Sequence, residues 1–242
     1  MTIAHEQEYQ LRTGDFDRYE HVQPASVLDV FQDIAGISAD NTPSMSYEEM
    51  KARGYFWAIT RIKYEVMRQP KMHERVIGRT WPLAPSRAGF QREYTIRSLS
   101  DELLVRGTSK WIVMDFANRS LVNAADVYQG PDDFSDETTF PDKLRKLKTI
   151  EPQGEPVRCT PAYTDIDLNG HVNNIRYANF ALNAFGEGAA RGVKTLQIDY
   201  RHEVQLGQTL EIYTATRETG EAVAQGMLED GSLSFVCQFE FA

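Results

Sequence analysis

A short polar segment, residues 163–177, concentrates side chains that could carry out chemistry. Its sequence is Tyr-Thr-Asp-Ile-Asp-Leu-Asn-Gly-His-Val-Asn-Asn-Ile-Arg-Tyr. The alternation of Asp167, Asn169 and His171 predicts three polar side chains on the same side of an extended backbone. A carboxylate or an imidazole can take a proton from water, and an N–H donor can stabilise an oxyanion. The segment is therefore a candidate site for chemistry at a carbonyl group.

The same segment also has a purely structural interpretation. Asn169 or Asn173 could satisfy the free N–H groups at a helix start, and Gly170 suits a left-handed backbone. Two features favour a catalytic role over this structural one. They are the same-side spacing of the polar residues and their position before a helix whose N-terminus presents oriented N–H donors.

The elements that must position this segment form two similar sets. Residues 24–41 and 172–190 both place apolar side chains at helical spacing. Strand-like runs follow each helix, at about 55–66, 75–83, 90–99 and 103–115 after the first, and at about 194–203, 209–217, 221–229 and 232–241 after the second. One helix on one sheet leaves an open face and edge, so the pattern favours two units that pack together.

The predicted organisation is a first unit over residues 1–130, a linker over 131–156, and a second unit over 157–242 that carries the polar segment. The linker is rich in proline and acidic residues and is expected to contain one short helix at most. Its basic run, residues 143–148, is either a solvated charge run or a docking patch for an acidic partner.

The overall composition excludes several classes of protein. A content of 41% hydrophobic and 11% aromatic residues is enough for a core, which excludes a wholly disordered chain. The net charge of −9 disfavours nucleic acid as a partner. No stretch approaches the ~20 apolar residues of a membrane span, and the N-terminus has no signal pattern. With two widely spaced cysteines, we expect a cytoplasmic protein without a membrane anchor, disulfide framework or zinc site.

The segment from Asp165 to Tyr177, D-x-D-x-N-x-H-V-N-N-x-x-Y, resembles the signature of the acyl-acyl carrier protein thioesterases, and in particular their bacterial members. Further segments that resemble this family are Trp57–Arg61, Thr80-Trp81 with Arg92, Ser109–Met114 and Asp199–Glu203. The resemblance implies an α+β fold of two tandem hot-dog units, each a long helix wrapped by an antiparallel sheet.

The resemblance also implies the catalytic groups, which are Asp167, Asn169, His171 and Glu203. Plant members often have a cysteine directly after this glutamate, where the present chain has Val204, so the resemblance implies attack by activated water without cofactor or metal. Glu203 and His171 would activate the water, and Asn169 would hold the water or the carbonyl. Asp167 would orient these groups or act as the base. Direct attack by Asp167, to form a mixed anhydride, stays open as an alternative.

The implied activity is hydrolysis of fatty acyl-acyl carrier protein to free fatty acid and carrier protein, as part of fatty acid biosynthesis. The acylated carrier protein is then the partner, and a homodimer is possible. One alternative is an acyl-CoA thioesterase of the same fold. Another, from a different class, is a non-catalytic module that binds acyl thioesters, although the sequence shows no DNA-binding helix pair of the kind a regulator would carry.

Overall fold

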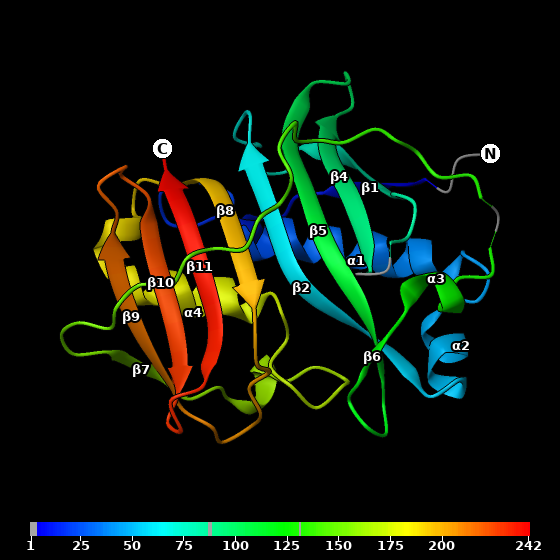
Figure 1. The fold of residues 1–242 in the computed structure, drawn as a ribbon. Helices are drawn as coiled ribbons and strands as arrows, with labels where there is room; N and C mark the ends of the chain where they lie inside the picture. Colours follow the sequence, from blue (N-terminus) through cyan, green and yellow to red (C-terminus); the bar gives the residue numbers. More distant parts are fainter. Residues whose placement is uncertain (1–3, 87–88, 131) are drawn as a thin grey trace. The chain divides into compact units, whose positions relative to one another are not determined.

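The structure is a computed structural model that describes residues 4–86, 89–130 and 132–242. Its tertiary contacts divide the chain into two compact units (Figure 1). One unit comprises the chain up to Thr13 together with Asp29–Leu144, and the other comprises Gly14–Leu28 together with Arg145–Ala242. The segment expected to be a linker, residues 131–156, is thus shared between the units, with the division after Leu144.

The first unit contains an antiparallel sheet with the strand order β1-β3-β4-β5-β2, and β6 pairs with β5. The strands are β1 (His5–Gln10), β2 (Tyr55–Val66), β3 (Arg75–Pro82), β4 (Phe90–Ser98), β5 (Leu103–Asp115) and β6 (Leu121–Val122). The four predicted strands, β2 to β5, are confirmed to within one residue at each end. Strand β1 was missed because its sequence, HEQEYQ, has almost no apolar residues to give a strand signal.

Helix α1 spans Pro24–Asp40, as the spacing of its apolar residues predicts. Within the first unit, Phe31 and Ile34 are fully buried. The ring of Phe31 stacks on Tyr94 of β4 with a centroid separation of 4.4 Å. The apolar stripe of α1 therefore packs on the face of the sheet to which Tyr94 points.

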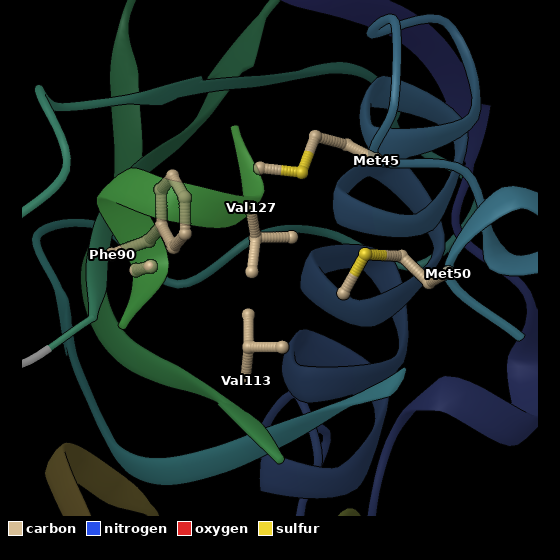
Figure 2. Packing of buried hydrophobic residues seen from close by; sticks show 6 residues of the cluster. Met45, Met50, Phe90, Val113 and Val127 are labelled. Carbon is tan, nitrogen blue, oxygen red and sulfur yellow. The ribbon is translucent and has the colours of Figure 1, made fainter. Parts of the chain in front are cut away.

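A second, smaller core of the first unit lies between two short helices that the sequence analysis missed, α2 (Tyr47–Ala52) and α3 (Ala124–Val127). Figure 2 shows the side chains that meet there, which are Met45, Met50, Phe90, Val113, Ala124 and Val127. A helix of one or two turns is too short to show periodicity. The detectable signal was a capping box, because Glu49 N–H donates to Ser46 Oγ and Ser46 N–H donates to Glu49 Oε2.

The second unit repeats the arrangement with the strand order β8-β11-β10-β9-β7. Its elements are β7 (Val157–Cys159), α4 (Arg176–Phe185), β8 (Val193–Tyr200), β9 (Leu210–Thr216), β10 (Ala222–Leu228) and β11 (Leu233–Phe241). The four predicted strands are found with shorter bounds. The three-residue strand β7 was not predicted.

Helix α4 is shorter than the predicted 172–190. It begins at Arg176, because Val172 pairs with Ile166 and is held in the preceding loop. It ends at Gly186, whose φ of 53° closes the helix before a 3-10 turn, Gly186–Ala189.

Helix α4 packs on its own sheet through aromatic contacts. The Tyr177 ring lies edge-on to Tyr200 of β8 at 5.5 Å and to Phe235 of β11 at 5.4 Å, and Phe185 contacts Phe239 of β11. Because Tyr177 is only 2% exposed, the first turn of the helix is fixed to these two strands. The loop that enters α4 is therefore attached to a rigid base.

The connecting segment is anchored to each unit by hydrogen bonds to buried carboxylates. In the first unit, the fully buried carboxylate of Glu93 accepts hydrogen bonds from N–H and Oγ1 of Thr139, at 2.8 and 2.5 Å. In the second unit, the fully buried carboxylate of Asp199 accepts the Leu147 N–H at 2.9 Å. No helix occurs in its described residues, 132–156. The backbone N–H groups of Thr139 and Leu147 therefore donate to buried side chains and not to the carbonyl groups of a helix.

Candidate active site

The loop before α4 is a tight turn and not the extended segment that the sequence analysis expected. Ile166 and Val172 pair across its base. Inside this pair, Asp167 N–H donates to His171 O at 2.9 Å, and Gly170 N–H donates to Asp167 O at 3.0 Å. The predicted extended backbone from Asp167 to His171 is therefore wrong, because the chain reverses direction between these two residues.

The sequence itself favours this turn. Gly170 has a φ of 82°, a left-handed conformation that glycine adopts without strain. The Asp167 side chain closes the turn from within, since its Oδ1 accepts the N–H of Asn169 at 2.8 Å. The Asn169 residue is exposed, and its side chain makes no hydrogen bond within the described part of the chain.

The structure brings His171 and Glu203 together from separate elements. His171 Nε2 lies 3.3 Å from Glu203 Oε1. The two side chains are 23% and 37% exposed, so water reaches both. Glu203 lies just after β8, and His171 pairs with Gln205 of the same segment. An imidazole and a carboxylate at this separation, open to solvent, can accept a proton from a water molecule.

The buried hydroxyl of Tyr177 fixes the chain next to Glu203. Val204 N–H donates to Tyr177 Oη at 3.1 Å, and Val172 N–H donates to Val204 O at 2.8 Å. Burial raises the pKa of Tyr177 to about 12, and the negative charge of Asp167 contributes to the increase. The hydroxyl is therefore neutral, and Val204 is held on both sides. The sequence analysis placed Tyr177 in the motif but assigned it no role.

Asn173 satisfies two backbone N–H groups where the chain enters α4, although the N-cap residue itself, Ile175, has no side-chain cap. Ile175 N–H donates to Asn173 Oδ1 at 3.0 Å, and Arg176 N–H donates to Asn173 O at 2.9 Å. Asn169 takes no part in these hydrogen bonds. Two of the N–H groups that were expected to face a developing oxyanion are thus already satisfied.

The two cysteines are free thiols with little tendency to ionise. Partial burial raises the pKa of Cys159, and the nearby Asp165 carboxylate adds to the effect. Cys237 is fully buried in β11, and burial raises its pKa well above the ordinary value. Because the thiolate is the nucleophilic form of cysteine, both thiols are poorly suited to attack a thioester.

His202, next to Glu203, does not join the pair. Its Nδ1 lies 2.8 Å from the carbonyl oxygen of Leu233. Among the described residues, no cluster of three or more histidine, cysteine, aspartate or glutamate side chains is arranged to hold a metal ion. None of the helices in the described ranges has the length and apolar content needed to cross a membrane.

Two units, each a helix on an antiparallel sheet, together with an imidazole–carboxylate pair beside the second helix, are the features of a double hot-dog thioesterase. Residues 2–130 match the family described as Acyl-ACP thioesterase N-terminal domain, where ACP is acyl carrier protein. Residues 151–232 match the Acyl-ACP thioesterase C-terminal domain. The chain therefore belongs to the acyl-ACP thioesterase family, as the resemblance of its motifs implies.

Individual relatives and structures agree with this assignment. The chain is 26% identical over 218 residues to the chloroplastic oleoyl-acyl carrier protein thioesterase of Coriandrum sativum, a match that covers 77% of this chain and 58% of the relative. The chain spans about half the length of the curated relatives it matches.

Solved structures confirm the double hot-dog fold. The 12:0-ACP thioesterase from Umbellularia californica superposes with a TM-score of 0.87 at 19% identity and covers 100% of this chain and 98% of its own. An acyl-ACP thioesterase from Bacteroides thetaiotaomicron superposes with a TM-score of 0.86 at 18% identity, over 99% of this chain and 98% of its own.

Proposed function

We propose that this protein hydrolyses the thioester of a fatty acyl-ACP to a free fatty acid and the carrier thiol. The observation that carries the proposal is the 3.3 Å approach of His171 Nε2 to Glu203 Oε1 at a site open to water. Family membership supplies the reaction type, and the names of the curated relatives, oleoyl- and palmitoyl-acyl carrier protein thioesterases, supply the substrate class.

In the proposed mechanism, the His171–Glu203 pair takes a proton from water while the water oxygen bonds to the thioester carbonyl carbon. The carbonyl oxygen becomes an oxyanion, and the amide of Asn169 donates to it. The C–S bond then breaks, and the proton returns to the leaving sulfur. The exposed and uncommitted side chain of Asn169 supports this role.

The position of Asp167 favours an orienting role over a role as base or nucleophile. Its Oδ1 already accepts the N–H of Asn169, and its peptide group closes the turn at both its N–H and its carbonyl oxygen. One carboxylate oxygen and the peptide group of Asp167 are therefore already engaged in the hydrogen bonds that shape the turn. We therefore assign Asp167 to the positioning of Asn169 and His171.

Exposed apolar side chains beside the pair suit an acyl thioester as ligand. Leu168, in the turn, is 77% exposed, and Leu206, directly after the residue that pairs with His171, is 56% exposed. Single exposed leucines are common, but two that each lie three residues in sequence from a member of the pair offer contact area for the apolar part of a substrate. Both cysteines are free, which fits the reducing cytoplasm as the place of the reaction.

The test is thiol release by the purified protein from a panel of ACP and CoA thioesters of different acyl lengths, with the His171→Gln variant as the control for site-dependent turnover. We expect hydrolysis that is lost in the variant, with higher kcat/KM for ACP substrates. A preference for CoA thioesters would favour the acyl-CoA thioesterase. Binding of acyl-ACP without thiol release would identify a non-catalytic module and contradict the proposal.

A further inference from the structure

One polar side chain at the entrance of α4 has no hydrogen-bond partner. Asn174 is half-buried, and its side chain makes no hydrogen bond to any residue that the structure describes. All other buried or half-buried polar side chains of residues 163–177, a segment that the structure describes in full, are engaged. These side chains are those of Asp165, Asp167, His171, Asn173, Arg176 and Tyr177.

The two adjacent asparagines of this segment therefore differ in what they can still bind. Asn173 uses its side-chain oxygen to accept the Ile175 N–H at 3.0 Å. The amide of Asn174 keeps an acceptor oxygen and both N–H donors. A polar group that is removed from water without a partner destabilises the protein, so native structures leave few such groups. A half-buried amide that stays open is suited to a ligand with a matching donor and acceptor.

The backbone of Asn174 is fixed to the same aromatic base as the site. Its carbonyl oxygen accepts the Tyr200 hydroxyl at 3.0 Å, and the Tyr200 ring lies edge-on to Tyr177 at 5.5 Å. The Tyr177 hydroxyl in turn accepts the N–H of Val204, which directly follows the proposed catalytic glutamate. Asn174 also lies only three residues after His171 in the sequence. The open amide is therefore held beside the loop that carries the chemistry.

The proposed substrates contain a matching group close to the reacting sulfur. In thioesters of ACP and of CoA, the sulfur ends a pantetheine arm, and an ethylene unit separates it from the first amide of that arm. This amide has an N–H donor and a carbonyl acceptor, so it can pair with an asparagine side chain through both. The acyl chain of a saturated fatty acid offers neither.

We propose that the side chain of Asn174 binds the pantetheine amide nearest to the sulfur and so positions the arm while the His171–Glu203 pair acts on the carbonyl. The proposal rests on the thioester hydrolysis proposed above. Asn174 then recognises the leaving group and not the acyl chain. Removal of such a contact weakens the binding of the substrate and of the transition state alike, which raises KM and leaves kcat unchanged.

A pair of thioesters with the same acyl chain tests this proposal on the full chain. The N-acetylcysteamine thioester contains the first amide of the arm, and the S-pentyl thioester has the same length without it. We expect Asn174→Leu to raise KM for the first thioester about five- to tenfold, to leave KM for the second unchanged, and to keep kcat within roughly twofold for both. If Asn174→Leu does not fold, Asn174→Asp keeps the shape, loses both N–H donors and should shift KM in the same direction.

The matched control is Asn179→Leu. Asn179 is also half-buried, in α4, and its side chain has no hydrogen bond to a described residue. Its substitution should change KM for neither thioester, so the control separates the position of the open amide from its burial.

Equal changes in KM for both thioesters, or no change for either, would overturn the role of Asn174. Dissociation constants of the corresponding thioethers, which cannot be hydrolysed, separate this failure from that of the proposed function. If the wild type releases no thiol, but Asn174→Leu weakens binding of the amide-containing thioether alone, the hydrolysis is refuted and the amide site stands. Unchanged dissociation constants in the variant would overturn the amide site as well.

Discussion

Two loops, residues 15–23 before α1 and residues 165–173 before α4, share their backbone hydrogen bonds but have different neighbours. We call them the N-terminal loop and the C-terminal loop. In both loops an aspartate closes the turn on itself and a histidine follows, so the local hydrogen bonds are shared. Only in the C-terminal loop does the histidine meet a glutamate from a distant strand end, at 3.3 Å. The comparison shows that short-range hydrogen bonds fix the shape of both loops, whereas the carboxylate that faces the histidine differs. It is Asp17 of the same turn for His21, at 3.4 Å, and Glu203 of a separate element for His171.

The largest expected effect comes from removing that long-range partner. We expect Glu203→Gln to lower kcat by at least about a hundredfold, because the pair loses the group that accepts the proton. The variant should remain folded, since the Glu203 side chain is 37% exposed. His202→Ala, at the adjacent and exposed position, is the matched control and should retain most of its turnover. Near-normal kcat in Glu203→Gln, measured by thiol release, would remove this residue from the mechanism.

A smaller effect is expected from the residue that holds Glu203 in place. Tyr177→Phe removes the acceptor of the Val204 N–H, and an unsatisfied buried N–H group costs about 1–3 kcal/mol. Besides this loss of stability, we expect kcat to fall about tenfold with little change in KM. The reason is that the catalytic pair is displaced whereas the substrate contacts are unchanged.

The control for this variant is Tyr200→Phe, which also loses a hydroxyl hydrogen bond in the same unit, to Asn174 O at 3.0 Å. Urea denaturation should show a loss of stability in both variants, whereas kcat should fall only in Tyr177→Phe. Equal kcat in the two variants would show that Tyr177 contributes packing alone.

The basic run of the connecting segment is expected to affect encounter with the carrier protein and not the chemical step. Its four charged side chains are exposed, whereas Leu144 is buried and Leu147 is partly buried. The exposed residues are Lys143, Arg145, Lys146 and Lys148. Reversing their charge should raise KM for an acyl-ACP by about three- to tenfold and flatten its salt dependence, because exposed charges mainly steer association.

Two measurements decide whether this run is a docking patch. Turnover at saturation, and hydrolysis of a short uncharged thioester, should be unchanged in the reversed variant. If kcat/KM for the acyl-ACP is also unchanged at two ionic strengths, the run is a solvated charge stripe and docking occurs elsewhere.

The smallest effect is expected for the cysteines. The double variant Cys159→Ala, Cys237→Ala should keep wild-type kcat, because neither thiol belongs to the proposed reaction. The raised pKa of each thiol means less thiolate at a given pH, so alkylation between pH 7 and 8 should be slower than that of a free cysteine with an ordinary pKa of about 8.5. Loss of hydrolysis in a folded double variant would restore a covalent cysteine mechanism.

The sequence alone determined the elements with a strong local period. Strands β2 to β5 were predicted to within one residue, because alternation between buried and exposed positions is a property of neighbours in the chain. Helix α1 was found for the same reason. The motif from Asp165 to Tyr177 pointed to the loop and to His171, but the alternation within it gave the wrong backbone, since Asp167 and Gly170 fold the segment into a turn.

Only the tertiary structure decided where distant groups meet. Glu203 and His171 come from different elements, and so do Val204 and Tyr177, which are joined by a hydrogen bond from Val204 N–H to Tyr177 Oη. The periodicity of the sequence does not encode such contacts. The connecting segment was expected to be a linker whose basic run was either solvated or a docking patch. It is anchored because Glu93 and Asp199 are buried and must be satisfied, and the nearest donors are N–H groups of that segment.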